Sequence, residues 1–179
     1  MKIRVDDIKE KPLVLSADEE VSGYPVLSRM QEEGECIFLS PVRLQVTATR
    51  EYDHIRVAGS VEVDVRMGCS RCLAEFEAGI GSAFTIFFSR QTAIEPDEDE
   101  VELAEQDLVA ATYAGDEIDL LDEMQEQVVM ELPFKPLCRE ECKGLCSSCG
   151  ADLNQGECGC EKNPTSLSFS ALKDFKAAK

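Results

Sequence analysis

The sequence predicts an α+β fold: a curved antiparallel β-sheet covered by a helix, with a small cysteine-rich, metal-binding C-terminal segment. Three observations support this: apolar residues that alternate between residues 40 and 90, one helical apolar stripe, and a late group of six cysteines. The chain has 179 residues, of which 44% are hydrophobic. Such a chain can bury a real core, so a wholly disordered protein is excluded.

The sheet is predicted from alternation of period two. Apolar residues occupy every second position in residues 42–48 and again in residues 55–67, with charged and polar residues between them. This spacing places one set of side chains in the core and the other in water. A third strand follows through residues 80–88. Gly59 falls on the inner face, where it suggests a bulge or a bend.

A helix is predicted beyond this sheet. Residues 108–113 could form another strand, and Asp119 then resembles a helix N-cap. The apolar residues that follow have helical spacing and are Leu121, Met124, Val128 and Leu132. Pro133 ends this helix, because the residue before a proline avoids the α region. A last helix is expected near residues 167–175.

The chain is predicted to have two parts. Residues 1–136 would form the α+β domain, with an acidic loop at about 91–106, and residues 137–179 the zinc-binding segment and C-terminal helix. Residues 91–131 contain fifteen Asp or Glu and no Lys or Arg, in a chain of net charge −18. This stretch is either a solvated linker or a docking surface for a basic protein. Indiscriminate binding to polyanions is disfavoured.

The cysteine count points to metal rather than to disulfides. The first residues have acids where a signal peptide has its apolar core, and no apolar run is long enough to span a bilayer. We therefore expect a cytoplasmic protein with no membrane association. In that compartment nine cysteines are better explained by metal binding, and the odd count argues against a complete disulfide framework.

Six cysteines near the C-terminus have the spacing C-x3-C-x3-C-x2-C-x8-C-x-C: Cys138, Cys142, Cys146, Cys149, Cys158 and Cys160. Two residues between Cys146 and Cys149 let one tight turn aim both sulfurs at one ion. The following Gly150 permits a positive φ, so that backbone N–H groups can face the sulfurs. Six thiols exceed the four that one zinc needs, so the sequence leaves the ligand set open. Iron in a redox site is the alternative metal, since soft ligands alone do not separate the two.

Cys69 and Cys72 form a second C-x2-C at the end of the long alternating strand. They could be half of a second zinc site together with two of the spare C-terminal thiols. A redox dithiol, or reduced thiols in a tight hairpin, are the other interpretations. Cys36 stands alone and is expected in the core. One structural zinc is expected, and a second could join it.

The sequence offers no catalytic residues. It contains no glycine-rich phosphate loop, no G-x-S-x-G and no H-E-x-x-H. Its single histidine, His54, has no cysteine or serine partner nearby in sequence and is expected on the surface. We therefore expect neither an enzyme nor a small-molecule substrate.

These motifs, taken together, resemble the YceD family of large ribosomal RNA subunit accumulation proteins. The stretches that carry the resemblance are residues 69–73 with Phe76, residues 115–121 with Leu132 and Pro133, residues 142–150 with Leu153, Asn154, Cys158 and Cys160, and residues 163–164 with Leu172 and Lys173. Some similar family members lack most of the C-terminal cysteines, which implies that the metal stabilises the tail of this branch. Ser147 replaces the proline common in the family's knuckle and leaves both thiols in place.

The resemblance implies a cytoplasmic bacterial protein that supports 23S ribosomal RNA accumulation and large-subunit assembly, with no reaction attached. Two other classes remain: a rubredoxin-like iron electron carrier and an rRNA-processing enzyme. The partner is either a basic ribosomal or processing protein that docks on residues 91–131, or the ribosomal RNA precursor itself. Direct RNA contact would use a local basic face made of Arg43, Arg56, Arg66, Arg71, Lys162, Lys173, Lys176 and Lys179.

Overall fold

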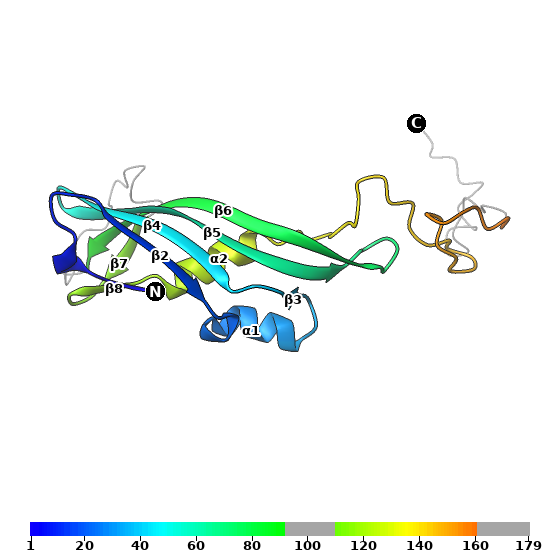
Figure 1. The fold of residues 1–179 in the computed structure, drawn as a ribbon, viewed down its shortest axis with the longest axis horizontal. Helices are drawn as coiled ribbons and strands as arrows, with labels where there is room; N and C mark the ends of the chain where they lie inside the picture. Colours follow the sequence, from blue (N-terminus) through cyan, green and yellow to red (C-terminus); the bar gives the residue numbers. More distant parts are fainter. Residues whose placement is uncertain (92–109, 161–179) are drawn as a thin grey trace, which may run out of the picture.

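A computed structural model describes residues 1–91 and 110–160 and shows a long curved sheet with a helix against one face (Figure 1). The main sheet has the strand order β2-β4-β5-β6-β7, with β3 paired to β5. Its strands are β2 (Leu13–Glu19), β3 (Ile37–Phe38), β4 (Val42–Glu51), β5 (His54–Gly68), β6 (Glu75–Arg90) and β7 (Ala110–Tyr113). A second, two-stranded sheet pairs β1 (Lys2–Arg4) with β8 (Glu117–Asp119). The predicted fold class is confirmed.

The central meander of β4, β5 and β6 follows the predicted alternation. The apolar residues expected on the inner face are buried: Val42, Leu44, Val46, Ala48, Ile55, Val57, Val61, Val63, Val65 and Met67. Strands β5 and β6 are 15 and 16 residues long and pair antiparallel over nearly their full length. They therefore form one extended hairpin, which ends in the turn that carries Cys69 and Cys72.

Gly59 is required because another backbone lies very close to it. The pairing register runs without interruption from Val46 through Gly59 to Phe84, so of the bulge or bend expected there the bulge is absent. A Cβ atom at position 59 would stand 2.1 Å from the carbonyl oxygen of Gln45, a distance that no real side chain tolerates. Only glycine leaves room for β4 at this point of the sheet.

One strand pairing is parallel. The predicted strand near residues 108–113 is present as β7, and it pairs parallel to the end of β6. Alternation cannot reveal this direction, because both kinds of pairing place successive side chains on opposite faces.

Helix α2 (Leu121–Glu131) covers the inner face of the sheet, where it contacts β5 and β6. Met124 and Val128 point into the core, as predicted, and the helix ends before Pro133. The N-cap is Leu120 rather than Asp119. Asp119 still serves the helix start, because its Oδ1 accepts a hydrogen bond from the N–H of Leu121 at 3.2 Å.

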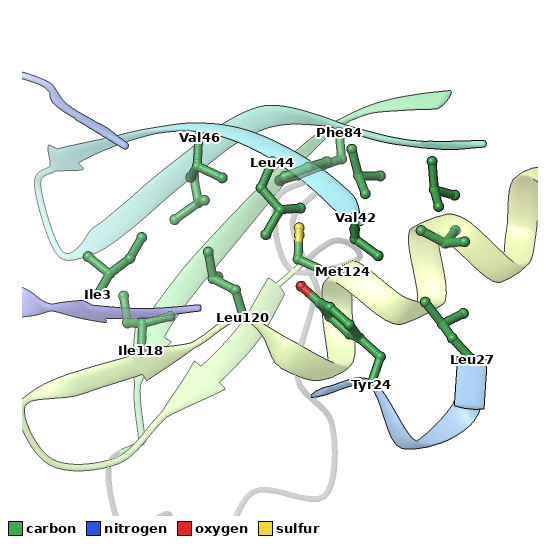
Figure 2. Packing of buried hydrophobic residues seen from close by; sticks show 14 of the residues in the cluster. Ile3, Tyr24, Leu27, Val42, Leu44, Val46, Phe84, Ile118, Leu120 and Met124 are labelled. Carbon is green, nitrogen blue, oxygen red and sulfur yellow. The ribbon is translucent and has the colours of Figure 1, made fainter. Parts of the chain in front are cut away.

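The first 40 residues, for which the sequence pattern predicts no elements, supply the strands β1, β2 and β3 and a second helix. Helix α1 (Pro25–Glu32) buries Leu27, and Tyr24 just before it is 1% exposed. The side chain of Gln125 in α2 accepts a hydrogen bond from the N–H of Val26 at 3.2 Å, which ties the two helices together. Figure 2 shows Tyr24, Leu27 and Met124 packed below the strand residues Val42, Leu44 and Val46.

Two predictions fall on other parts of the chain. The acidic loop at about 91–106, apart from Gln91, and the helix near residues 167–175 lie outside the described residues. The division into residues 1–136 and 137–179 stays a prediction. In residues 1–91 and 110–160, no helix has the length and apolar character needed to cross a membrane.

Replacing Gly59 by alanine should destabilise the fold by about 2 kcal/mol or more, because the added Cβ forces β4 and β5 apart. Gly81→Ala in the neighbouring strand is the matched control, since the nearest atom to its Cβ would lie at 3.5 Å, an ordinary contact. Urea unfolding of both variants measures the difference. Equal midpoints for the two alanine variants would show that the close approach of β4 does not constrain position 59.

Candidate metal centre

Eight of the nine cysteines gather into two groups of four. Within each group the sulfur atoms all lie within 4.8 Å of one another. The first group, here the hairpin cluster, consists of Cys69, Cys72, Cys138 and Cys142. The second, here the tail cluster, consists of Cys146, Cys149, Cys158 and Cys160. The structure thus assembles every thiol that the sequence singles out, and it divides the C-terminal six between two sites.

The hairpin cluster joins two distant parts of the chain. Cys69 and Cys72 lie in the turn that connects β5 to β6, where the N–H of Leu73 bonds the carbonyl oxygen of Cys69 at 2.9 Å. Cys138 and Cys142 come from the segment that follows α2. The sulfurs of Cys69 and Cys142 are 3.7 Å apart, as are those of Cys72 and Cys138.

This spacing fits a tetrahedral metal. With metal–sulfur bonds of about 2.3 Å, the sulfur–sulfur edge of a regular tetrahedron is about 3.8 Å. All four cysteines are free thiols, and Cys69 and Cys142 are buried while Cys72 and Cys138 are half-buried. The hairpin cluster therefore has the donor atoms and the separations that one metal ion of zinc or iron type needs.

Backbone contacts between the hairpin turn and the C-terminal segment support the cluster. The N–H of Ser70 bonds the carbonyl oxygen of Pro136 at 2.8 Å, and the carbonyl oxygen of Arg71 accepts from the N–H of Leu145 at 3.1 Å. The Arg71 guanidinium donates to the carbonyl oxygens of Cys142 at 2.8 Å and Glu140 at 3.1 Å. These bonds fix the two pairs of thiols relative to each other.

Gly144 allows this close contact. It has a φ of +73°, which favours glycine, and a Cβ there would stand 3.0 Å from the carbonyl oxygen of Arg71. The glycine therefore serves two needs at once: a left-handed backbone and room for the hairpin turn.

The tail cluster is built on a tight turn, as its spacing predicts. The N–H of Gly150 bonds the carbonyl oxygen of Cys146, and the N–H of Cys146 bonds the carbonyl oxygen of Ala151, both at 2.8 Å. Gly150 has the expected positive φ, +73°. An isolated antiparallel bridge between Leu145 and Asp152 closes the base of the turn. Cys149 is exposed and the other three thiols are half-buried, so this site is more open than the hairpin cluster.

Backbone N–H groups favour a thiolate in each cluster. Hydrogen bonds from the backbone of Cys138 and Cys72 lower the pKa of Cys69 to about 6. Those from Cys149 and Ser148 lower the pKa of Cys146 to about 6. Metal ions bind the thiolate rather than the thiol, so both clusters contain a cysteine prepared to bind at neutral pH.

Burial and close contact between thiols raise the pKa of other cysteines in the clusters. Burial, followed by contact with neighbouring thiols, raises the pKa of Cys138 to about 12. Contact with Cys149 and Cys158 raises the pKa of Cys160 to about 12. Four thiolates cannot share so small a volume without a cation, and a divalent ion would supply the missing positive charge.

Asn154 connects the two clusters. Its side-chain amide donates to the Cys142 sulfur at 3.4 Å, and its carbonyl oxygen accepts from the N–H of Lys143 at 2.9 Å. The bond from Asn154 lowers the pKa of Cys142. A residue between Cys149 and Cys158 of the tail cluster therefore supports a sulfur of the hairpin cluster, as outer-shell groups do in metal sites.

Two residues considered from the sequence lie apart from the clusters. Cys36 is 5% exposed and belongs to the hydrophobic core, as expected. His54 lies at the β4–β5 turn with Asp53 at 3.1 Å and packs edge-on against Phe87, so its side chain is half-buried rather than on the surface. Sequence reasoning did not assign roles to Arg71 and Asn154 in supporting the thiols. Their spacing from the cysteines is the signal that could have identified them.

Known proteins resemble this chain over much of its length. A family model described as "Large ribosomal RNA subunit accumulation protein YceD" matches residues 57–176. A chloroplastic YCED homolog 1 of Arabidopsis thaliana is 24% identical over 157 residues, which cover 76% of this chain and 49% of that protein. The homolog 1 of Zea mays is 28% identical over 144 residues, covering 68% and 49%. An uncharacterized protein of Mycobacterium tuberculosis is 34% identical over 99 residues, covering 55% and 45%.

The chain spans about half the length of these curated relatives. No solved structure matches it. The family match takes in most of the long hairpin, helix α2 and both cysteine clusters. The chain belongs to the YceD family of large ribosomal RNA subunit accumulation proteins.

Proposed function

We propose that this protein supports the accumulation of 23S ribosomal RNA as a non-enzymatic factor in large-subunit assembly, with a structural zinc ion in each cysteine cluster. The observation that carries the proposal is the family match through residues 57–176, which contain all eight clustered cysteines. The names of the two plant relatives, which describe them as large ribosomal RNA subunit accumulation proteins, also support the proposal.

A structural role for zinc is supported by the lack of helices and strands in the segment that carries most of the clustered cysteines. In the described part of the chain, the residues from 132 to 160 form no helix or strand and only one isolated bridge. Such a segment cannot bury a core of its own, so metal binding would supply its folding free energy. Four thiolates also complete a tetrahedron, which leaves no coordination position for water or substrate. That closed geometry supports a non-enzymatic protein.

A basic protein is favoured over naked RNA as the direct partner. Three of the arginines that could form a basic face are already engaged. Arg43 pairs with Asp64 at 3.1 Å, and Arg66 pairs with Glu77 at 2.8 Å. Arg71 is bound to backbone carbonyl oxygens. Arginines engaged in this way have little left to offer phosphate groups, whereas the net charge of −18 attracts cationic proteins.

Metal analysis separates the zinc proposal from the rubredoxin-like alternative. Natively purified protein should contain about two zinc ions per chain and be colourless, because each four-cysteine cluster binds one ion of a metal without redox chemistry. Elemental analysis and a visible spectrum of the same sample measure this. Stoichiometric iron with the colour of a thiolate–iron site would contradict the zinc proposal and favour the electron carrier.

The cellular role is tested in a strain that lacks the gene. The intact chain should restore the ratio of 23S to 16S ribosomal RNA, whereas a Cys69→Ser, Cys72→Ser double variant should leave it at the level of the deletion strain, because the hairpin cluster is lost. Tyr52→Ser, at an exposed residue outside both clusters, is the control and should restore the ratio. Loss of the gene without any change in 23S RNA would refute the proposed function. Conversion of a 23S precursor by the purified protein alone would revive the processing enzyme.

A further inference from the structure

An apolar groove lies where α1, β5 and the segment after α2 meet. Its volume is about 350 Å³. All of its lining residues except Glu35 are apolar, among them Met30, Cys36, Met67, Leu132, Pro133 and Phe134. Met30 near the end of α1 and Leu132 just after α2 place the groove at the ends of both helices.

The rim of this groove exposes a large aromatic side chain. Phe134 is 97% exposed, although its neighbours Leu132 and Pro136 are half-buried in the same structure. Phe134 adjoins the apolar lining of the groove and so extends its exposed apolar surface, and contiguous apolar surface of this kind marks interaction sites. Met30 and Met67 add flexible side chains that can adjust to a partner.

The groove is poorly suited to a small polar ligand. Glu35 is the one charged residue among its lining residues in the described chain. Sites for metabolites have several polar groups that converge on the ligand. An apolar lining with a single carboxylate matches instead the apolar side chains of a peptide segment.

Charged residues around the groove indicate the sign of the net charge that such a peptide segment would have. Glu32 and Glu33 end α1, and Glu131 ends α2; together with Glu35 they place four exposed acids at the two helix ends that border the groove. Arg29 and Lys135 are the basic residues in the same stretches, so the acids outnumber them two to one. The net charge of the chain, −18, acts in the same direction. Electrostatic complementarity therefore favours a cationic partner.

The hairpin cluster holds one wall of this groove. Pro136, which lines it, accepts the hydrogen bond from Ser70 in the hairpin turn at 2.8 Å. Loss of the cluster would release this wall. The groove and the metal site are thus parts of one arrangement.

We propose that this groove binds a basic amphipathic segment of a partner protein. Apolar side chains of the segment enter the groove and cover Phe134, while its Lys and Arg side chains face Glu32, Glu33, Glu35 and Glu131. The inference rests on the proposed function and specifies its partner: a protein of the assembling large subunit that presents such a segment.

Binding is measured by fluorescence anisotropy of a labelled peptide built from alternating pairs of Leu and Lys. One control peptide has Glu in place of Lys, and another has Ser in place of Leu. The intact protein should bind the Leu/Lys peptide at least tenfold more tightly than either control. Phe134→Ser should weaken binding about tenfold or more. Tyr52→Ser, at an equally exposed aromatic residue outside the groove, should leave binding unchanged.

The charges are tested in the same assay. A Glu32→Gln, Glu33→Gln, Glu35→Gln variant should bind the Leu/Lys peptide severalfold more weakly and show a shallower dependence on salt, because surface charge attraction is screened. Failure of the intact protein to bind, equal binding of the Ser control peptide, or equal effects of Phe134→Ser and Tyr52→Ser would each overturn the proposal. Zinc content and urea midpoints of the variants confirm that they are folded.

The occupant in cells is identified with a photo-crosslinking amino acid at position 134. Cross-links to a protein segment that carries both apolar residues and Lys or Arg support the proposal. Cross-links to RNA, or to a second copy of this chain, overturn it.

Complementation separates this inference from the proposed function. If the intact chain and Phe134→Ser both restore 23S RNA, the groove is not the partner site, and the role in RNA accumulation stands. If the intact chain does not restore 23S RNA, the proposed function fails whatever the peptide binds.

Discussion

Four cysteines from two separate parts of the sequence form the contact on which the position of residues 132–160 depends. Cys69 and Cys72 come from the turn of the long β5–β6 hairpin, and Cys138 and Cys142 from a segment without helices or strands of its own. Sulfur separations of 3.7 Å leave space for a tetrahedral metal at the centre. Backbone hydrogen bonds from Ser70 and Leu145 hold the two parts in register. Without this contact, the segment would have little apolar burial to fix its position.

The length of the β5–β6 hairpin determines where the hairpin cluster lies. The paired strands carry the turn beyond the region covered by α2, so the chain leaving that helix runs along the hairpin and meets the turn at Pro136 (Figure 1). On the way it passes the apolar groove, whose wall includes Met67 near the end of β5. The groove therefore shares Met67 with the sheet and is linked to the metal site through the hydrogen bond from Ser70 to Pro136. A change in metal binding would alter the surface that we propose for the partner.

Sequence patterns predict the parts of this structure that local periodicity determines. The alternation in β4 and β5 and the stripe in α2 identify most of the inner face, because burial on one side imposes those periods. Edge strand β2 also alternates in burial, but Val14 places an apolar residue on its exposed face, and its place beside β4 depends on tertiary contacts. The parallel direction of β7 has no signature in alternation. The cysteine spacing predicts metal binding, yet six late thiols fit several ligand sets. Only the position of the hairpin turn assigns Cys138 and Cys142 to Cys69 and Cys72.

The central claim is that a metal in the hairpin cluster joins the C-terminal segment to the hairpin. Native mass spectrometry combined with amide hydrogen exchange of the Cys69→Ser, Cys72→Ser variant tests it most directly. The account predicts one zinc instead of two, and exchange at Ser70 and Leu145 at least about tenfold faster, with the β4–β5 amides unchanged. A Cys149→Ser, Cys158→Ser control should also lose one zinc and keep Ser70 protected. Two zinc ions in the first variant, or full protection of Ser70 and Leu145 without the hairpin cluster, would contradict the account.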